Sequence, residues 1–147
     1  MGCIEAQRAP ATLSAVLGSC IGLTLWHPRL RAAAMGHIVL SNSAGRKATP
    51  GKFADTALMH MIELLGEMGI NASGLQAKVV GGASMFGGGG PLQTGADNEE
   101  AVLAQLAAAN IKVVARHLGG KKGRRVNFDC ETGVLKVEIV GQPPELI

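Results

Sequence analysis

Two side chains in the first quarter of the chain, Cys20 and His37, are of the types that carry out nucleophilic acyl transfer. A cysteine nucleophile needs an imidazole that accepts its proton and later protonates the leaving group, and a third group that orients the imidazole. Cys20 follows a glycine turn, Leu17-Gly18-Ser19, at the head of an apolar run. If this run and the one that contains His37 are neighbouring antiparallel strands, the two side chains can meet.

The spacing of Cys20 and His37 also fits a second interpretation. Cysteine is often a small buried apolar residue, and a histidine in an apolar run is often a core residue. The pattern by itself favours this structural interpretation, so the chemistry depends on the elements that position the two residues.

Runs of apolar residues that are short or alternate with polar residues predict strands along much of the chain. We expect strands over residues 11–17, 20–26, 32–40, 75–80 and 111–115, and a hairpin of 124–129 with 134–140 around a turn at 131–133. Apolar residues at spacings of three and four predict one helix over about 53–68. A second helix is expected over about 98–109, with Asp97 or Asn98 as its N-cap. The mixture predicts an α+β (mixed α/β) domain of six or more strands and two main helices.

Length and composition indicate one folded domain. The chain has 147 residues, of which 47% are apolar and 17% charged, which excludes a disordered protein. We expect residues 1–10 to be a flexible terminus and 11–147 to form a single domain. No apolar run is long enough for a transmembrane helix, and the scarcity of aromatic residues argues against a platform for single-stranded nucleic acid.

The cysteine count and the first residues bear on the cellular setting. The three cysteines show no C-x-x-C spacing, which argues against a disulfide framework and a zinc site. The first residues lack the basic and apolar regions of a secretory signal, so a reducing, cytoplasmic setting is expected. His27, His60 and His117 have no second ligand at metal spacing, so no metal is expected.

Two further segments could contact a partner. The basic stretch Lys121, Lys122, Arg124 and Arg125 is most simply a solvated loop, and the alternative is a site for phosphate or an acidic partner. The glycine-rich segment 81–95 lacks the Gly-Lys-Ser/Thr of a phosphate-binding loop and is expected to form a wall beside the active site. Within it, Phe86 is either an exposed contact residue or a core residue.

Six blocks of the sequence together resemble the CheD-type chemoreceptor glutamine deamidases. These blocks follow the family's order and spacing from about residue 12 to 140, and they read LGSCIGLTLWHP, MGHIVL, PGKFADTAL, KVVGGASMF, TGADNEEAV and LGGKKGRRVNFDCETG. The resemblance implies the fold that this family shares with the cysteine hydrolase core of deamidating toxins. It also implies an enzyme without a cofactor that converts receptor glutamines to glutamates and releases ammonia.

The resemblance assigns a role to each site residue. Cys20 falls on the nucleophile, His37 on the general base and acid, and Ser14 on a threonine that orients the histidine. Backbone N–H groups of Ser19 and Cys20 are the expected oxyanion donors. Serine keeps a hydroxyl and a carbonyl for the orienting role but lacks the methyl group that stiffens threonine, and Thr12 is an alternative orienter.

The implied partners are the cytoplasmic helical domain of chemoreceptors and a CheC-type chemotaxis phosphatase. Asp97 departs from the family, which often has a basic residue there, and an acid would alter partner contacts. Neither nucleic acid binding nor membrane insertion is expected. Two alternatives remain open at this point: a binding module that docks on a receptor or phosphatase with little catalysis, and a cysteine hydrolase that acts on another protein amide.

Overall fold

The computed structural model describes residues 3–39, 50–84 and 94–147, and within these it contains nine strands and two long helices. The strands are β1 (Ile4–Arg8), β2 (Thr12–Leu17), β3 (Ile21–His27), β4 (Ala32–Ile38), β5 (Gln76–Gly81), β6 (Lys112–Leu118), β7 (Arg124–Asp129), β8 (Leu135–Glu138) and β9 (Glu145–Leu146). The helices are α1 (Ala54–Glu67) and α2 (Thr94–Ala108), and short 3-10 turns span Pro50–Lys52 and Ala72–Gly74. This content confirms the predicted α+β class.

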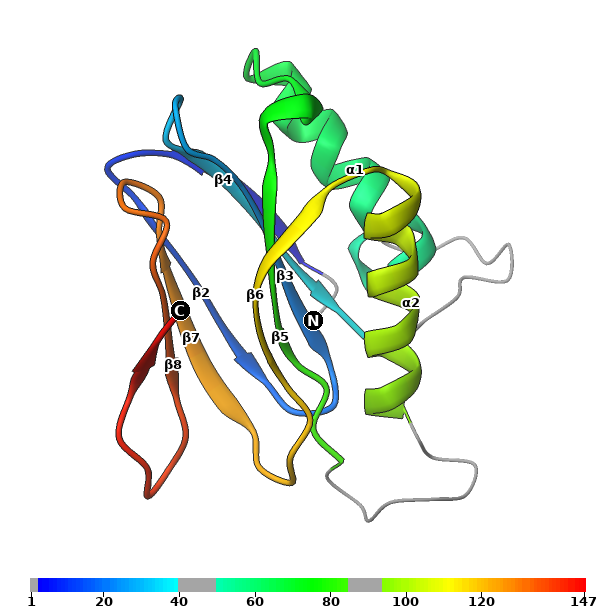
Figure 1. The fold of residues 1–147 in the computed structure, drawn as a ribbon, viewed down its shortest axis with the longest axis vertical. Helices are drawn as coiled ribbons and strands as arrows, with labels where there is room; N and C mark the ends of the chain where they lie inside the picture. The colour runs from blue at the N-terminus through cyan, green and yellow to red at the C-terminus, as the bar shows by residue number, and fades with distance from the viewer. Residues whose placement is uncertain (1–2, 40–49, 85–93) are drawn as a thin grey trace.

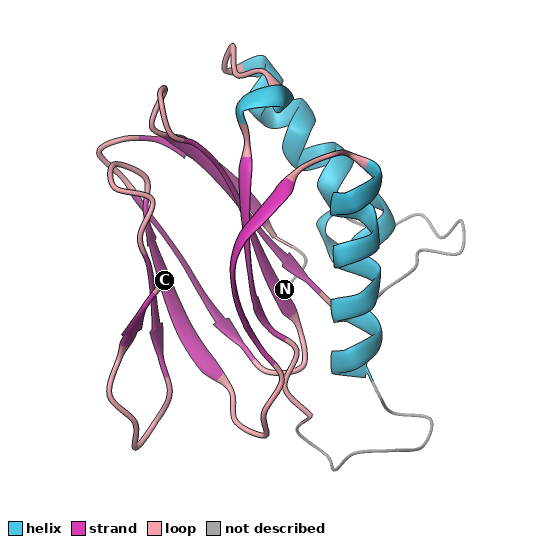
Figure 2. Ribbon diagram, viewed as in Figure 1, coloured by secondary structure: helices cyan, strands magenta, loops and turns pink. Residues whose placement is uncertain are grey.

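The strands form two sheets that pack face to face, and both helices cover the outer face of the larger sheet (Figures 1 and 2). The larger sheet has the order β1-β4-β3-β5-β6 and the smaller one β2-β7-β8-β9. All neighbouring strands are antiparallel except β5 and β6, which are parallel. Helix α2 connects these two strands, as a parallel pair requires a long crossover. The molecule therefore has three layers: helices, a five-stranded sheet and a four-stranded sheet.

Two apolar cores lie between the three layers. One joins the helices to the five-stranded sheet, and the other lies between the two sheets. The central strand β3 contacts both cores, so five consecutive residues, Ile21 to Leu25, are buried. A strand that is covered on both faces needs apolar residues along its whole length, which explains the near-continuous apolar run.

Helix α1 packs closely against β4, the strand that carries His37. Its buried face, which includes Leu58, Met61 and Leu65, has the spacing of three and four that the sequence predicted. Gly36 on β4 permits the close approach, because a Cβ atom there would lie 2.9 Å from the Met61 Sδ. The packing holds β4 in place next to the central strand.

The structure differs from the sequence predictions at several elements, among them the short β9, which was not predicted, and β8, which ends at Glu138 rather than at 140. Residues 1–10 were expected to be flexible, but β1 pairs with β4, and Ile4 and Ala6 pack against the first core. Helix α2 begins at Thr94, so the prediction of Asp97 or Asn98 as its N-cap is wrong, and Asp97 lies in the first turn. Strand β6 continues to Leu118, beyond the predicted end at 115. The predicted loops at 41–51 and 81–95 lie largely outside the described residues.

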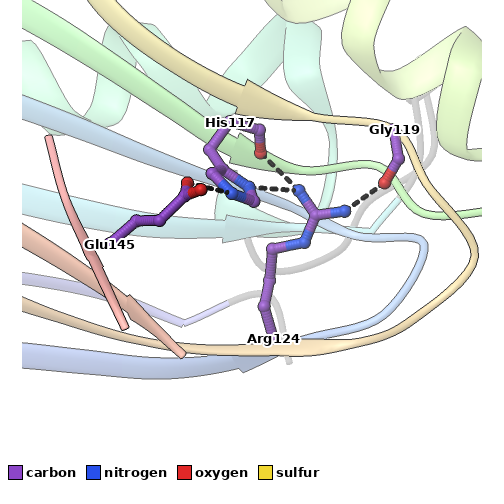
Figure 3. Close-up of polar contacts among 4 residues, drawn as sticks. All are labelled: His117, Gly119, Arg124 and Glu145. Atoms are coloured by element: carbon purple, nitrogen blue, oxygen red, sulfur yellow. Dashed lines mark hydrogen bonds and ion pairs between the residues drawn. The ribbon is translucent and has the colours of Figure 1, made fainter. Parts of the chain in front are cut away.

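A polar cluster joins the two sheets at one end (Figure 3). The Arg124 side chain on β7 is buried and donates hydrogen bonds to the main-chain oxygens of His117 and Gly119. The same guanidinium lies 2.9 Å from the His117 Nδ1, and the His117 Nε2 lies 2.7 Å from a Glu145 carboxylate oxygen. The cluster thus links β6 of the larger sheet to β7 and β9 of the smaller one.

Neither described helix has the length and apolar character needed to cross a bilayer.

Candidate active site

The turn between β2 and β3 presents Cys20 and is held by the end of β5. The main-chain N–H of Ala83 donates to the Gly18 oxygen and that of Gly82 to the Cys20 oxygen, both at 3.0 Å. Gly81 has a φ of +109°, and a Cβ atom there would lie 2.3 Å from the Cys20 oxygen. Only glycine tolerates both the positive φ and this close approach. Gly81, the last residue of β5, therefore supports the turn that carries Cys20.

Asn98 on α2 ties the same turn to the end of β4. Its side chain is fully buried, and its Nδ2 donates to the Val39 oxygen at 2.8 Å and, at a long 3.5 Å, to the Ser19 oxygen. Among the described residues, its Oδ1 has no hydrogen-bond partner. The sequence analysis considered Asn98 only as a helix cap, because nothing in the local sequence indicates a contact between α2 and these two strands.

Cys20 directly precedes β3, His37 lies on the neighbouring antiparallel strand β4, and both residues share one face of the sheet. Gly22 pairs with His37 and Ile21 with Ile38, so Cys20 is next to the end of this ladder, opposite Val39. Alternation along both strands directs the Cys20 and His37 side chains into the space between the two sheets. Residues in this relation are diagonal neighbours, whose Cβ atoms are usually within about 7–8 Å. No hydrogen bond between the two side chains is found within the described residues.

His37 borders a pocket of about 200 Å³ between the two sheets. The pocket is lined by Cys3, Glu5, Leu13, Ser14, Ala15, Met35 and His37. The N–H of His37 donates to the Cys3 oxygen at 3.0 Å, so Cys3 stands directly beside His37 at the start of β1. Cys20 is not one of the lining residues and is only 8% exposed. The sequence analysis missed this position of Cys3 because it did not predict β1.

Burial favours the uncharged form of both predicted catalytic side chains. It raises the pKa of the Cys20 thiol, because a thiolate loses hydration in an apolar site. It lowers the pKa of the His37 imidazole for the corresponding reason. At neutral pH the site therefore contains a thiol and a neutral imidazole, and the imidazole is in the form that can accept a proton.

The main-chain N–H groups of Ser19 and Cys20 donate no hydrogen bond to any described residue. The carbonyls of Gly18, Ser19 and Cys20, in contrast, all accept one. Because a peptide unit is planar, fixing its carbonyl also fixes the direction of the attached N–H. The turn that carries the Cys20 thiol thus has two main-chain donors that are fixed in direction and have no acceptor among the described residues, which makes them candidates to bind an oxyanion.

Ser14 borders the His37 pocket, but its hydroxyl points elsewhere. On β2 the residues on either side of it, Leu13 and Ala15, contact the core between the sheets, whereas Ser14 is exposed. The Ser14 hydroxyl donates to the Asn127 Oδ1 at 2.7 Å on the outer face of the smaller sheet. Because its side chain points to the outer face, Ser14 contributes its main chain to the lining of the pocket. The exposed Thr12 lies on the same outer face.

The other candidate residues lie apart from this site. Phe86 falls outside the described residues. The His27 Nδ1 accepts from the Leu30 N–H, and the His60 Nδ1 lies 3.8 Å from a Glu63 carboxylate oxygen. Cys130 is buried in the core between the sheets. Across the described ranges, no group of three or more His, Cys, Asp and Glu side chains could hold a metal ion.

Comparison with known proteins places these observations in a family. The family model described as CheD chemotactic sensory transduction matches residues 39–139. A chemoreceptor glutamine deamidase CheD of Thermotoga maritima is 42% identical over 130 residues, which cover 88% of this chain and 82% of the relative. A probable chemoreceptor glutamine deamidase CheD of Symbiobacterium thermophilum is 44% identical over 132 residues, with 86% and 80% covered.

The family-model match begins after Cys20 and His37, so the segment that carries them is compared through the relatives. A probable chemoreceptor glutamine deamidase CheD of Desulfitobacterium hafniense is 34% identical over an alignment of 152 residues that covers 100% of this chain and 95% of the relative. The similarity thus extends from the strand of the candidate nucleophile through the C-terminal hairpin. On this evidence the chain belongs to the CheD family.

Proposed function

We propose that this protein is a chemoreceptor glutamine deamidase that uses Cys20 as its nucleophile and His37 as its general base and acid. One observation carries the assignment of these residues: Cys20 directly precedes β3 and His37 lies on its paired strand β4, with both side chains on the same face, and the N–H groups of Ser19 and Cys20 have no acceptor in the described structure. The names of the relatives support the substrate that we propose, a glutamine side chain of a chemoreceptor.

The reaction proceeds in two halves. His37 takes the Cys20 thiol proton as the sulfur attacks the glutamine carboxamide carbon, and the carbonyl electron pair moves onto the oxygen. The N–H groups of Ser19 and Cys20 stabilise this oxyanion, and each such donor is commonly worth about 2.7–4 kcal/mol. When the intermediate collapses, the C–N bond breaks and His37 protonates the leaving ammonia. Water then attacks the thioester with His37 as base, the C–S bond breaks, and glutamate leaves as the thiol is restored.

The resting site requires a small rearrangement before this chemistry. Cys20 is buried and is a diagonal neighbour of His37, so the thiol and the imidazole must approach each other when the substrate binds. Catalytic hydrogen bonds are often long in the absence of substrate. The neutral imidazole and the intact thiol are the correct reactants for a proton transfer that accompanies attack.

Residue 14 orients His37 through its main chain in this proposal. The hydroxyl of Ser14 is engaged with Asn127 on the opposite face of β2, whereas the pocket side of the residue is its backbone. A carbonyl is present whether the residue is serine or threonine, so the difference from the family threonine does not remove the orienting group.

We propose the cytoplasm as the setting and the cytoplasmic helical domain of a chemoreceptor as the partner. The names of the relatives support the receptor as partner. A CheC-type phosphatase is a further proposed partner, which rests on the family resemblance. Its test is co-elution of the two purified proteins in size-exclusion chromatography.

Cys3 is the competing thiol, because it lines the His37 pocket and is exposed. The decisive experiment measures the intact mass of a receptor cytoplasmic fragment after incubation with the parent protein, Cys20→Ala or Cys3→Ala. Each deamidation adds about one dalton. We expect Cys20→Ala to leave the mass unchanged and Cys3→Ala to retain at least half of the parent rate. The reverse result would transfer the nucleophile to Cys3.

The burial of Cys20 supports one alternative function, a receptor-binding module with little catalysis. The same experiment separates the two. If the parent protein leaves the fragment's mass unchanged while binding it in calorimetry, the molecule is a binding module and the deamidase proposal fails.

A further inference from the structure

A groove of about 650 Å³ lies on the smaller sheet and the segment that follows it, and the proposed chemistry does not use it. It is larger than the pocket beside His37. Its walls come from β2, the loop between β6 and β7, the start of β7, the end of β8 and the chain after β8: Val16, Lys121, Lys122, Gly123, Arg124, Arg125, Glu138, Ile139, Val140, Gln142 and Pro144. Both helices lie on the far side of the larger sheet, so no described helix covers this face (Figure 2).

The charge of the groove is predominantly positive. Lys121, Lys122 and Arg125 are exposed, and none of them forms an ion pair within the described part of the chain. The single carboxylate in the lining, Glu138, lies 3.9 Å from Lys136 and accepts a hydrogen bond from Asn127 at 3.4 Å. The lining thus combines three exposed cations that have no ion pair among the described residues with one carboxylate that already has partners, and that carboxylate's residue, Glu138, pairs with Arg125 across β7 and β8.

Arg124 belongs to the fold rather than to this charged surface. Its guanidinium points inward to His117 and Gly119, and its side chain is buried (Figure 3). The basic stretch of the sequence therefore divides into one structural arginine and three surface cations.

Exposed apolar side chains line the same groove. Val16 is 66% exposed and Val140 is 90% exposed, high values for valine in a small protein. A groove that combines exposed apolar side chains with unpaired cations fits a partner that carries carboxylates and an apolar residue close together. A nucleic acid fits it less well, since the lining has no aromatic side chain on which a base could stack.

The groove lies next to the turn that carries Cys20. Gly123 approaches the last residue of β2 so closely that a Cβ atom there would lie 3.0 Å from the Leu17 oxygen. Val16 pairs with Arg125 across β2 and β7. Val16 lies four positions before Cys20 in the chain, so the Cα atoms of the two residues are within about 13 Å of each other.

We propose that this groove binds an acidic segment of the protein substrate, next to the glutamine that reacts at Cys20. The inference rests on the proposed deamidase function and names its docking surface. Carboxylates of the segment pair with Lys121, Lys122 and Arg125, and an apolar side chain packs against Val16 and Val140. Binding there positions the target amide without any contact to the reacting atoms.

The test compares two triple variants on a chemoreceptor cytoplasmic fragment. The groove variant reverses the charge of the groove and carries Lys121→Glu, Lys122→Glu and Arg125→Glu. The control variant changes the net charge equally at exposed positions outside the groove and carries Arg29→Glu, Lys112→Glu and Arg116→Glu. We expect the groove variant to lose at least tenfold in kcat/KM, through KM, and the control to stay within twofold. For the parent and the control, raising the salt from 50 to 500 mM should raise KM, and for the groove variant it should not.

A binding measurement keeps this test independent of catalysis. In a Cys20→Ala background, calorimetry with the receptor fragment should show at least tenfold weaker binding for the groove variant than for the control. Equal affinities would overturn the docking surface even if the parent deamidates the fragment. If the parent binds an oligo-dT strand more tightly than polyglutamate of equal length, the groove is a nucleic acid site and the proposal is wrong. Absence of deamidation together with groove-dependent binding would overturn only the enzymatic proposal.

Discussion

At the scale of single residues, burial moves the pKa values of the Cys20 thiol and the His37 imidazole apart. A lowered His37 pKa places the acid limb of kcat/KM below about pH 6.5, and a raised Cys20 pKa places the alkaline limb above about pH 8.5. We therefore expect a broad plateau between the two limbs, whose apparent pKa values belong to the pair. Initial rates of ammonia release from pH 5 to 10 measure this. A narrow maximum near pH 7 would contradict the separation of the two pKa values.

Ser14 allows a second test at this scale. Because its hydroxyl donates to Asn127 on the outer face, Ser14→Ala and Ser14→Thr should both keep kcat within about twofold of the parent. Ser14→Ala should lower the free energy of unfolding by about 0.5–1.5 kcal/mol, since it removes one exposed hydrogen bond at most. Urea denaturation and deamidation rates measure the two quantities. Thr12→Val is the control on the same face, and a tenfold loss of kcat in Ser14→Ala alone would assign the orienting role to the hydroxyl.

At the scale of elements, the end of β5 holds the nucleophile turn through Gly81. Gly81→Ala places a methyl group against the Cys20 carbonyl at a positive φ, so the turn must move. We expect a loss of activity of at least tenfold and a loss of stability of about 1–3 kcal/mol. Ammonia release and urea denaturation measure the two losses. The matched substitution Gly66→Ala should cause neither of them. Gly66 lies in α1 with open space around it, and alanine there should stabilise the protein by up to about 1 kcal/mol.

Asn98 shows why the site needs three elements rather than two strands. Its amide bridges main-chain oxygens of the nucleophile turn and the end of β4, and it comes from a helix far along the chain. Within the described residues its buried amide oxygen has no partner, and a buried polar atom that stays unpaired costs about 1–3 kcal/mol.

At the scale of the whole molecule, the Arg124 cluster joins the two sheets between which the His37 pocket lies. Arg124→Met removes the donors to the His117 and Gly119 oxygens and should lower the free energy of unfolding by about 1–3 kcal/mol. Arg125→Met is the adjacent control: this exposed side chain should change stability by less than about 0.5 kcal/mol. Urea denaturation of both variants measures the difference, and equal midpoints would mean that the sheets do not depend on the cluster.

The sequence by itself determined the class of the fold and most of its elements. Apolar runs and helical spacing are local properties, so strands β2 to β5 and helix α1 lie close to their predicted ranges. The predicted antiparallel pairing of the run after Cys20 with the run that contains His37 was also correct, because a short connection between two apolar runs favours a hairpin, although Cys20 itself lies in the turn just before β3. The blocks of family resemblance pointed to the same two residues.

Only the tertiary structure decided how these residues are surrounded. Residues 4–8 are recognised as a strand, β1, only from their pairing with β4 in the structure, and this pairing brings Cys3 next to His37. The contact of Asn98 with the nucleophile turn and the division of the basic stretch into a buried Arg124 and exposed neighbours depend on packing between residues far apart in the chain. Such contacts leave no periodic signal in the local sequence, because they are selected by the shape of the assembled layers and not by the conformation of any one segment.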